Sequence, residues 1–567
     1  MADRNAQLPL AARRPRWRPR WRPHWPGLWS AVAVLIALVV VAPVLAVVVL
    51  ALMPGENIWP HMMATVLPRY AANTGVLMAG VGMLTAVAGT GAAWLVVMYR
   101  FPGRRWLDHA LLFPLAIPAY VGAYALVDFL DYSGALQTGL RAAMGWQSSR
   151  DYWFPAVRSP GMAVIVLSAA LYPYVYLMAR AAFREASGST YEVARALGAG
   201  PWGLFWRVGL PMARPAIATG VALALMEVVA DYGTVAHFGV PTLTSGIFSV
   251  WLTAGNAGGA AQIALVILGV VFLLIALERA GRRGARFHRQ ARSARPVAPV
   301  ALAGWRGWAA TAACLVPFGA GFVLPVAVMA GHGLRHAGGW LAPGLGRALW
   351  NTVSVGALAA AVTVAGALVM VYAARMSGRA LAQRLIPVTT LGYAAPGAVL
   401  AVGILVPLAA LDHRLADAVL AVTGRDPGLV LTGTAAALVL AYAVRFFAVA
   451  QGGVEAAFGR VAPALPLAAR SLGRGPGGAL AAVYLPLMRG SVAVALLMVF
   501  VDCVKELPAT LLLRPFNWNT LSTRVYEQAS LERLGDAAPA ALLVMAVGLV
   551  AVAILARATR AAGPGGG

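Results

Sequence analysis

The chain has 567 residues, of which 60% are hydrophobic types and only 11% are charged. A soluble globular protein carries about 25% charged residues, so this composition excludes a soluble domain and indicates a helical membrane protein. The net charge of +25 would suit a nucleic-acid-binding protein. However, the basic residues gather in alternate segments between the apolar runs, which indicates membrane topology and contact with anionic lipid, with no nucleic-acid partner.

Apolar runs of about 20 residues predict twelve membrane-spanning helices and an all-α fold. Basic residues favour the cytoplasmic side of short loops, so we expect both termini in the cytoplasm. A basic, proline-rich tail covers residues 1–29, and the predicted spans follow at residues 30–53, 73–99, 107–127, 160–183, 215–237, 259–280, 308–330, 351–374, 385–410, 429–450, 490–513 and 537–556.

Similar residues recur at a nearly constant separation, which predicts an internal repeat. The pairs are Gly198 and Gly473, Pro211 and Pro486, Glu227 and Asp502, and Asp231 and Glu506, each 275 apart, and Asn73 and Asn351, 278 apart. We therefore expect two parallel six-span repeats at residues 30–280 and 308–560, with core transmembrane domains at about 70–280 and 348–557. A basic cytoplasmic linker at 281–307 joins them, and a Gly-rich tail follows at 561–567. Parallel repeats favour a pathway at the interface between the halves.

A charged, glycine-punctuated segment, "YEVARALGAGPWGLFWRVGLP" (residues 191–211), separates the fourth and fifth predicted spans. Gly198 and Gly200 can supply the left-handed stop of one short helix. Pro201 can open the next helix, which Leu210 and Pro211 should end. The second helix carries Trp202 and Trp206 on one face, where large aromatic rings have little reason to meet water alone. This hairpin either docks into a partner's groove or lies on lipid and on its own protein.

The second repeat contains a related segment, "LPLAARSLGRGPGGALAAVYLP" (residues 465–486). Together the two segments resemble the EAA coupling loop of permeases in binding-protein-dependent ABC importers, which have the type I importer fold. One departure is Leu467, which stands where the loop has its acidic residue, so the two halves are expected to couple unequally. The resemblance implies ATPase-coupling roles for Glu192, Ala194, Gly198, Leu210, Pro211, Ala469, Gly473, Leu485 and Pro486.

The stretches at residues 230–251 and 501–530 resemble the fused permeases of ferric iron importers, although permeases for thiamine, polyamines and sulfate share parts of them. The resemblance implies a permease subunit of the bacterial inner membrane that moves cargo, ferric iron foremost. Its partners would be two ATPase subunits and a periplasmic substrate-binding protein. The only lysine, Lys505, lies outside any phosphate-binding loop, so we expect ATP on the partner subunits, no cofactor in this chain and no enzymatic activity of its own. A proton-coupled secondary transporter is the alternative.

Five charged residues fall within predicted spans: Glu227 and Asp231 in the fifth, and Asp502, Lys505 and Glu506 in the eleventh. The two carboxylates of each span are four positions apart and should therefore share a helical face. A charge near the bilayer centre costs about 3 kcal/mol on insertion scales, so such groups usually face a partner or a watery cavity. The sequence leaves two interpretations open. The residues line a translocation pathway for a hard, oxygen-preferring cation, or Lys505 pairs with Asp502 or Glu506 in helix packing. The histidines are scattered, so no resident metal site is predicted.

Overall fold

The computed structural model describes residues 28–186, 188–283, 298–376, 379–390, 392, 395–462 and 464–561. Most of the predicted basic tail, linker residues 284–297 and the end of the Gly-rich tail lie outside these ranges. Within them the fold is helical, and the only strands are β1 (Tyr99–Arg100) and β2 (Val300–Ala301), which pair in parallel. The predicted all-α membrane fold is confirmed.

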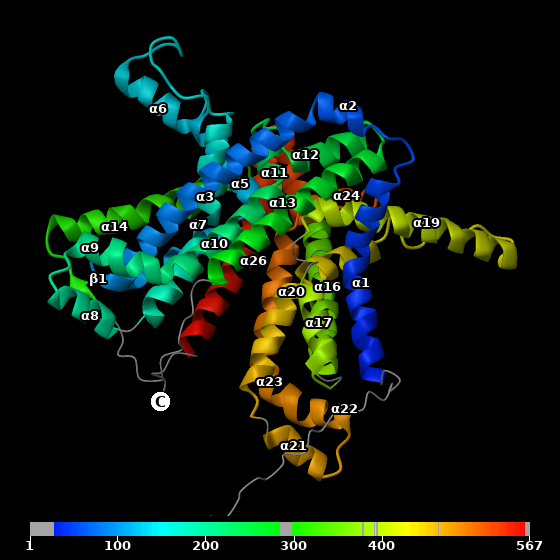
Figure 1. The fold of residues 1–567 in the computed structure, drawn as a ribbon. Helices are drawn as coiled ribbons and strands as arrows, with labels where there is room; N and C mark the ends of the chain where they lie inside the picture. Colours follow the sequence, from blue (N-terminus) through cyan, green and yellow to red (C-terminus); the bar gives the residue numbers. More distant parts are fainter. Residues whose placement is uncertain are drawn as a thin grey trace, which may run out of the picture.

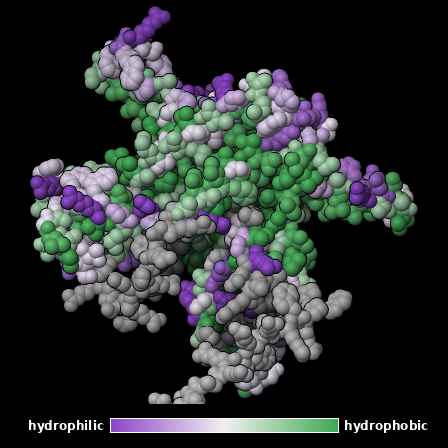
Figure 2. Space-filling model, in the orientation of Figure 1, coloured by the Kyte–Doolittle hydropathy of each residue, from purple (hydrophilic) through white to green (hydrophobic). Residues whose placement is uncertain are grey.

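Eleven helices of the described chain are long and apolar enough to cross a membrane, or twelve if one bent pair counts as a single span. Hydrophobic side chains cover the middle of the molecule, whereas hydrophilic ones gather toward its edges (Figure 2). The apolar runs therefore form the predicted spans, because a helix satisfies its own backbone hydrogen bonds and lets its side chains face lipid.

The first half begins with the α1 span and ends with the α13 span. Its elements are α1 (Leu28–Leu52), α2 (Trp59–Ala64), α3 (Leu67–Met98), α4 (Arg104–Ala110), the 3₁₀ turn η1 (Phe113–Ala116), α5 (Ala119–Leu130), α6 (Ala135–Met144), α7 (Pro160–Glu185), α8 (Gly188–Ala196), α9 (Pro201–Leu204), the π-helical turn η2 (Phe205–Gly209), α10 (Leu210–Ala230), α11 (Gly233–His237), α12 (Leu243–Phe248), the π-helical turn η3 (Ser249–Thr253) and α13 (Ala257–Arg283).

The second half begins with the α14 span and ends with the α26 span. Its elements are α14 (Trp305–Phe318), the π-helical turn η4 (Gly319–Val323), α15 (Leu324–Arg335), the 3₁₀ turn η5 (Ala337–Leu341), α16 (Leu345–Met376), α17 (Arg379–Thr389), α19 (Gly397–Thr423), α20 (Ala435–Arg460), α21 (Ala464–Ser471), α22 (Pro476–Ala479), the π-helical turn η6 (Leu480–Tyr484), α23 (Leu485–Lys505), α24 (Pro508–Leu513), α25 (Leu521–Ser530) and α26 (Leu534–Ala561).

Predicted boundaries are wrong at three places where a proline stands. The third span is not straight, because Pro114 and Pro118 interrupt it and the helices on either side meet at 96°. The ninth span begins only after Pro396, and α17 is a separate helix before it. The helix that Pro201 opens does not stop at Pro211 but continues into α10 through a π-helical turn. That wider turn precedes a residue that has no N–H to donate.

The two halves are interlocked through their first spans. Helix α1 packs against α16 and α19 of the second half as well as α13, whereas α15 packs against α5 of the first half as well as α26. The hairpins α8–α9 and α21–α22 lie well apart, at the lower left and the bottom of Figure 1. We call the end of the bundle that carries them the hairpin side and the opposite end the loop side.

Within each half, the same kinds of hydrogen bond join one long helix to the segment that leads into a short helix. The Nδ2 atom of Asn73 on α3 donates to the carbonyl of Pro241 at 2.8 Å, and that of Asn351 on α16 donates to the carbonyl of Asn519 at 2.9 Å. The Leu243 N–H donates to the Thr74 hydroxyl, which fixes α12 to α3. Likewise the Leu521 N–H donates to the Thr352 hydroxyl, which fixes α25 to α16. Corresponding positions can thus be compared across the halves at offsets of 278 and 275.

Candidate functional site

A cavity of about 160 Å³ lies where the two halves meet. The first half contributes residues of η1, α5, α7 and α10 to its wall, and the second contributes residues of α20, α23 and the segments beside α19 and α24. All five charged residues singled out from the sequence line it: Glu227, Asp231, Asp502, Lys505 and Glu506. The fold therefore brings together groups that are up to 279 positions apart in the chain.

Lys505 joins the halves at this cavity. Its Nζ atom lies 3.1 Å from Oδ1 of Asp502, one turn earlier on α23, and 3.4 Å from the carbonyl oxygen of Leu115 in the first half. Both charged side chains are partly exposed to the cavity. The structural pairing that the sequence left open is therefore present, and it sits in the wall of the cavity.

The sequence analysis missed a second cation, Arg445 of α20. Its Nη1 atom lies 3.3 Å from Oε1 of Glu506, and the two side chains are only 11% and 5% exposed. Gly397 makes the pairing possible, because a Cβ atom there would overlap both Arg445 and Glu506. The signal was available in the sequence, since Arg445 is a lone charge within the predicted span 429–450.

Asp231 and Glu506 do not lie inside spans, so the prediction that they share helical faces with Glu227 and Asp502 is wrong. Each follows the last residue of a helix and caps the next one. The Asp231 carboxylate accepts hydrogen bonds from the Thr234 hydroxyl at 2.8 Å and from the Val235 N–H at 3.0 Å, and Oε1 of Glu506 accepts one from the Ala509 N–H at 3.1 Å. Both carboxylates therefore stabilise the chain reversal beside the cavity.

Glu227 differs from the other carboxylates. It lines the cavity, is half-buried, and makes no hydrogen bond or ion pair within the described ranges of the chain. Its counterpart Asp502 is paired with Lys505. The cations come only from the second half, because alanines, Ala170 and Ala230, stand at the positions equivalent to Arg445 and Lys505. The cavity thus combines four carboxylates with two cations, and one carboxylate is free to meet a guest.

The two hairpins have the same backbone geometry. Gly198 and Gly473 are left-handed, with φ of 85° and 79°, and end the first helix of each hairpin. The prediction is confirmed for Gly198 but wrong for Gly200, which has a φ of −68°. In both, the residue after the glycine donates to the carbonyl five positions earlier, that of Ala194 or Ala469. Of the other predicted coupling positions, Glu192, Pro211, Leu485 and Pro486 are exposed, and Leu210 is half-buried.

Aromatic residues of the preceding spans anchor the hairpins, which the sequence analysis did not anticipate. The Trp94 ring of α3 packs edge-on against Phe183, Tyr191 and Phe205, with ring centroids 5.2–6.0 Å apart. Burial in this cluster raises the pKa of Tyr191 to about 12. The equivalent of Trp94 in the second half, Tyr372, donates from its hydroxyl to the Pro476 carbonyl at 2.6 Å.

The outward faces of the hairpins carry large apolar side chains in the open. Leu197, Trp202 and Leu472 are 83%, 75% and 82% exposed. These residues surround the glycine turns, at the tips farthest from the spans. An apolar surface of this kind on a rigid, anchored element is suited to a partner protein.

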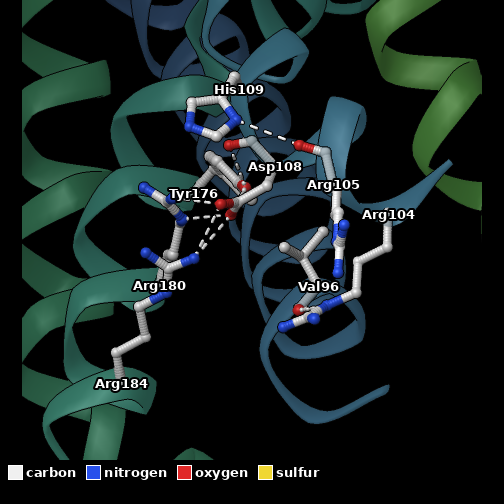
Figure 3. A network of polar contacts seen from close by, with 8 residues as sticks. All are labelled: Val96, Arg104, Arg105, Asp108, His109, Tyr176, Arg180 and Arg184. Carbon is white, nitrogen blue, oxygen red and sulfur yellow. Dashed lines mark hydrogen bonds and ion pairs between the residues drawn. The ribbon is translucent and has the colours of Figure 1, made fainter. Parts of the chain in front are cut away.

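A network of ion pairs fixes α4 to α7, the helix that precedes the first hairpin (Figure 3). Asp108 of α4 accepts two hydrogen bonds of 2.6 Å from Arg180 and further bonds from Arg184, both on α7, while the Tyr176 hydroxyl donates to the Asp108 carbonyl at 3.0 Å. In the second half Gln451 replaces Tyr176 and donates to the Ile386 carbonyl at 3.2 Å. The bent third span is thereby fixed to the helix that leads into α8.

Comparison with known proteins agrees with this architecture. Residues 80–284 match the family described as binding-protein-dependent transport system inner membrane component. The chain is 26% identical over 490 residues to the "Fe(3+)-transport system permease protein FbpB 2" of Haemophilus influenzae, covering 84% of this chain and 88% of that protein. Residues 80–284 thus carry the sequence pattern of this family, and the likeness to the FbpB 2 permease extends over most of the chain. The family resemblance inferred from the hairpin motifs is therefore confirmed.

Shorter relatives match part of the chain. It is 33% identical over 153 residues to a probable sulfate transport permease of Nephroselmis olivacea and 32% identical over 149 residues to the molybdenum transport permease ModB of Escherichia coli K12. These matches cover 27% and 26% of this chain, and about half of the first relative and 60% of the second. A solved bacterial alginate ABC transporter in complex with its periplasmic protein has a TM-score of 0.34 and 16% identity, covering 41% of this chain and 83% of that one.

Proposed function

We propose that this permease carries ferric iron across the bacterial inner membrane as the membrane-spanning subunit of an ABC importer. The observation that carries the proposal is the cavity between the halves, where four carboxylates face two cations and Glu227 has no partner among the described residues. A trivalent iron cation is hard and prefers oxygen ligands, which carboxylates supply. The similarity to the FbpB 2 permease, which extends over 84% of the chain, supports the same cargo.

An oxyanion is the competing cargo, because Arg445 and Lys505 line the cavity and the sulfate and molybdenum permeases are relatives. Both cations are already engaged, however, at 3.3 Å with Glu506 and at 3.1 Å with Asp502. An anion would have to displace a carboxylate from each before binding. The charge balance of the cavity therefore favours a cation.

Separate ATPase subunits would supply the energy at the two hairpins, whose exposed apolar tips offer a docking surface. Under this proposal the hairpin side and both termini lie in the cytoplasm, and a periplasmic substrate-binding protein docks at the loop side. ATP would be bound and hydrolysed on the partner chains, and this chain would perform no bond chemistry. The recurrence of hydrogen bonds at offsets of 275 and 278 supports the view that the two halves are tandem repeats.

Uptake in the native host tests the cargo. A strain that lacks the gene is complemented with the wild-type chain or with Gly198→Pro, and entry of radiolabelled ferric iron, sulfate and molybdate is measured in parallel. We expect wild-type complementation to restore iron uptake alone, and the variant to be inactive at normal membrane abundance. Restoration of sulfate or molybdate uptake instead would assign an anionic cargo. If an uncoupler abolishes uptake but inactivation of the ATPase partner leaves it intact, the chain is a proton-coupled carrier.

A further inference from the structure

Four tyrosines separate the central cavity from a second pocket on the loop side. Tyr120 and Tyr232 line the cavity, whereas Tyr124 and Tyr526 line the second pocket, which has a volume of about 150 Å³. The rings of Tyr120 and Tyr124 are 6.0 Å apart, and those of Tyr232 and Tyr526 are 5.7 Å apart. We call these four residues the tyrosine cluster.

The tyrosine cluster spans the seam between the halves. The hydroxyl of Tyr526, in the second half, donates to the hydroxyl of Tyr232, in the first, at 3.2 Å. At the rim of the loop-side pocket Arg158 and Glu532 form an exposed ion pair of 3.2 Å across the same seam. Relative movement of the halves must therefore break or remake these contacts.

Polar atoms in this region are buried without partners. The Tyr124 side chain is 1% exposed, and neither its hydroxyl nor Nε2 of His237 has a hydrogen-bond partner within the described ranges. The two rings pack edge-on at 4.6 Å, and both residues line the loop-side pocket. Burying such groups unpaired costs free energy, and a guest in the pocket that bound them would offset this cost.

Packing alone does not require these polar groups. At the positions equivalent to Tyr120, Tyr124, Tyr232 and His237, the second half has Ala398, Val402, Leu507 and Leu512. At the position equivalent to Tyr526 the first half has Phe248, which stacks on Tyr232 at 3.7 Å. Apolar residues thus fill the same places in the same fold. The phenol hydroxyls and the imidazole are therefore polar groups that the equivalent positions of the other half lack.

We propose that the loop-side pocket is a coordination site for a trivalent cation, with the phenol oxygens of Tyr124 and Tyr526 and the imidazole of His237 as ligands. This rests on the proposed function and identifies where cargo is selected before it reaches the carboxylates. Each phenol that binds releases its proton to water, and phenolate oxygen is a hard donor suited to ferric iron.

The test uses the full chain in lipid nanodiscs, titrated with ferric nitrilotriacetate. Iron bound to phenolate absorbs visible light by charge transfer, so the wild type should develop such a band, and Tyr124→Phe and Tyr526→Phe should lose it. Tyr172→Phe is the matched control, because Tyr172 is fully buried and its hydroxyl also lacks a partner in the described chain, but it lines neither pocket. Phenylalanine keeps each ring, so folding is preserved, and the elution volume of each variant checks this.

A band in the wild type and in Tyr172→Phe that both cluster variants lack would establish the site. No band in the wild type, or an unchanged band in both cluster variants, would overturn it. Iron uptake in the complemented strain distinguishes failure of the coordination site from failure of the proposed function. If the wild type restores iron uptake and both cluster variants do so equally well, the cargo is right and the coordination site is wrong. If the wild type restores only anion uptake, both are wrong.

Discussion

The first prediction concerns the stability that the buried ion pair of Arg445 and Glu506 gives to the protein. At 3.3 Å and an effective dielectric constant of about 20, the attraction between the two charges is about 5 kcal/mol. Replacing Arg445 with methionine leaves the Glu506 carboxylate 5% exposed and without its cation. Loss of one partner from a buried pair typically costs 3–5 kcal/mol, and we expect Arg445→Met to lower the unfolding free energy by about that amount.

The second ion pair supplies the control. Lys505 and Asp502 are 22% and 33% exposed, so water screens them, and Lys505→Met should cost about 1 kcal/mol or less. The double variant Arg445→Met with Glu506→Gln should recover most of the loss, because no uncompensated charge remains. Unfolding in detergent micelles titrated with denaturing surfactant measures all four proteins. Equal losses for the two single variants, or no recovery in the double variant, would refute the reasoning.

Three further predictions concern the hairpins and the cavity. Trp94→Ala removes the ring that anchors the first hairpin and should raise hydrogen exchange in α8 at least about tenfold, whereas Trp202→Ala, at an exposed position, should leave that exchange unchanged. Gly198→Pro cannot adopt a φ of 85° and should abolish ATPase binding measured by co-purification, whereas Gly200→Ala, at a φ of −68°, should retain it. Glu227→Gln removes the unpaired carboxylate and should slow iron uptake about tenfold at unchanged abundance; unaltered uptake would make this residue dispensable for transport.

Local chemistry determined much of the architecture. The membrane-spanning helices follow from the apolar runs, because a chain in lipid satisfies its backbone polar groups within each helix. The left-handed glycines at 198 and 473 could be predicted for a similar reason, since few other residues adopt that conformation where a helix must stop. The repeat offsets then allowed Glu227 to be matched with Asp502 before any contact was known.

Only the tertiary structure decided what surrounds each charge. The helix ends before Asp231 and Glu506 turn two predicted pathway carboxylates into caps for the helices that follow, and Arg445 reaches the cavity because Gly397 leaves room for it. The tyrosine cluster joins residues of α5 and α25 with one beside α11, which no periodicity connects. Helix propensity and hydropathy act over a few turns of chain, whereas partners, burial and exposure depend on which distant helices pack together.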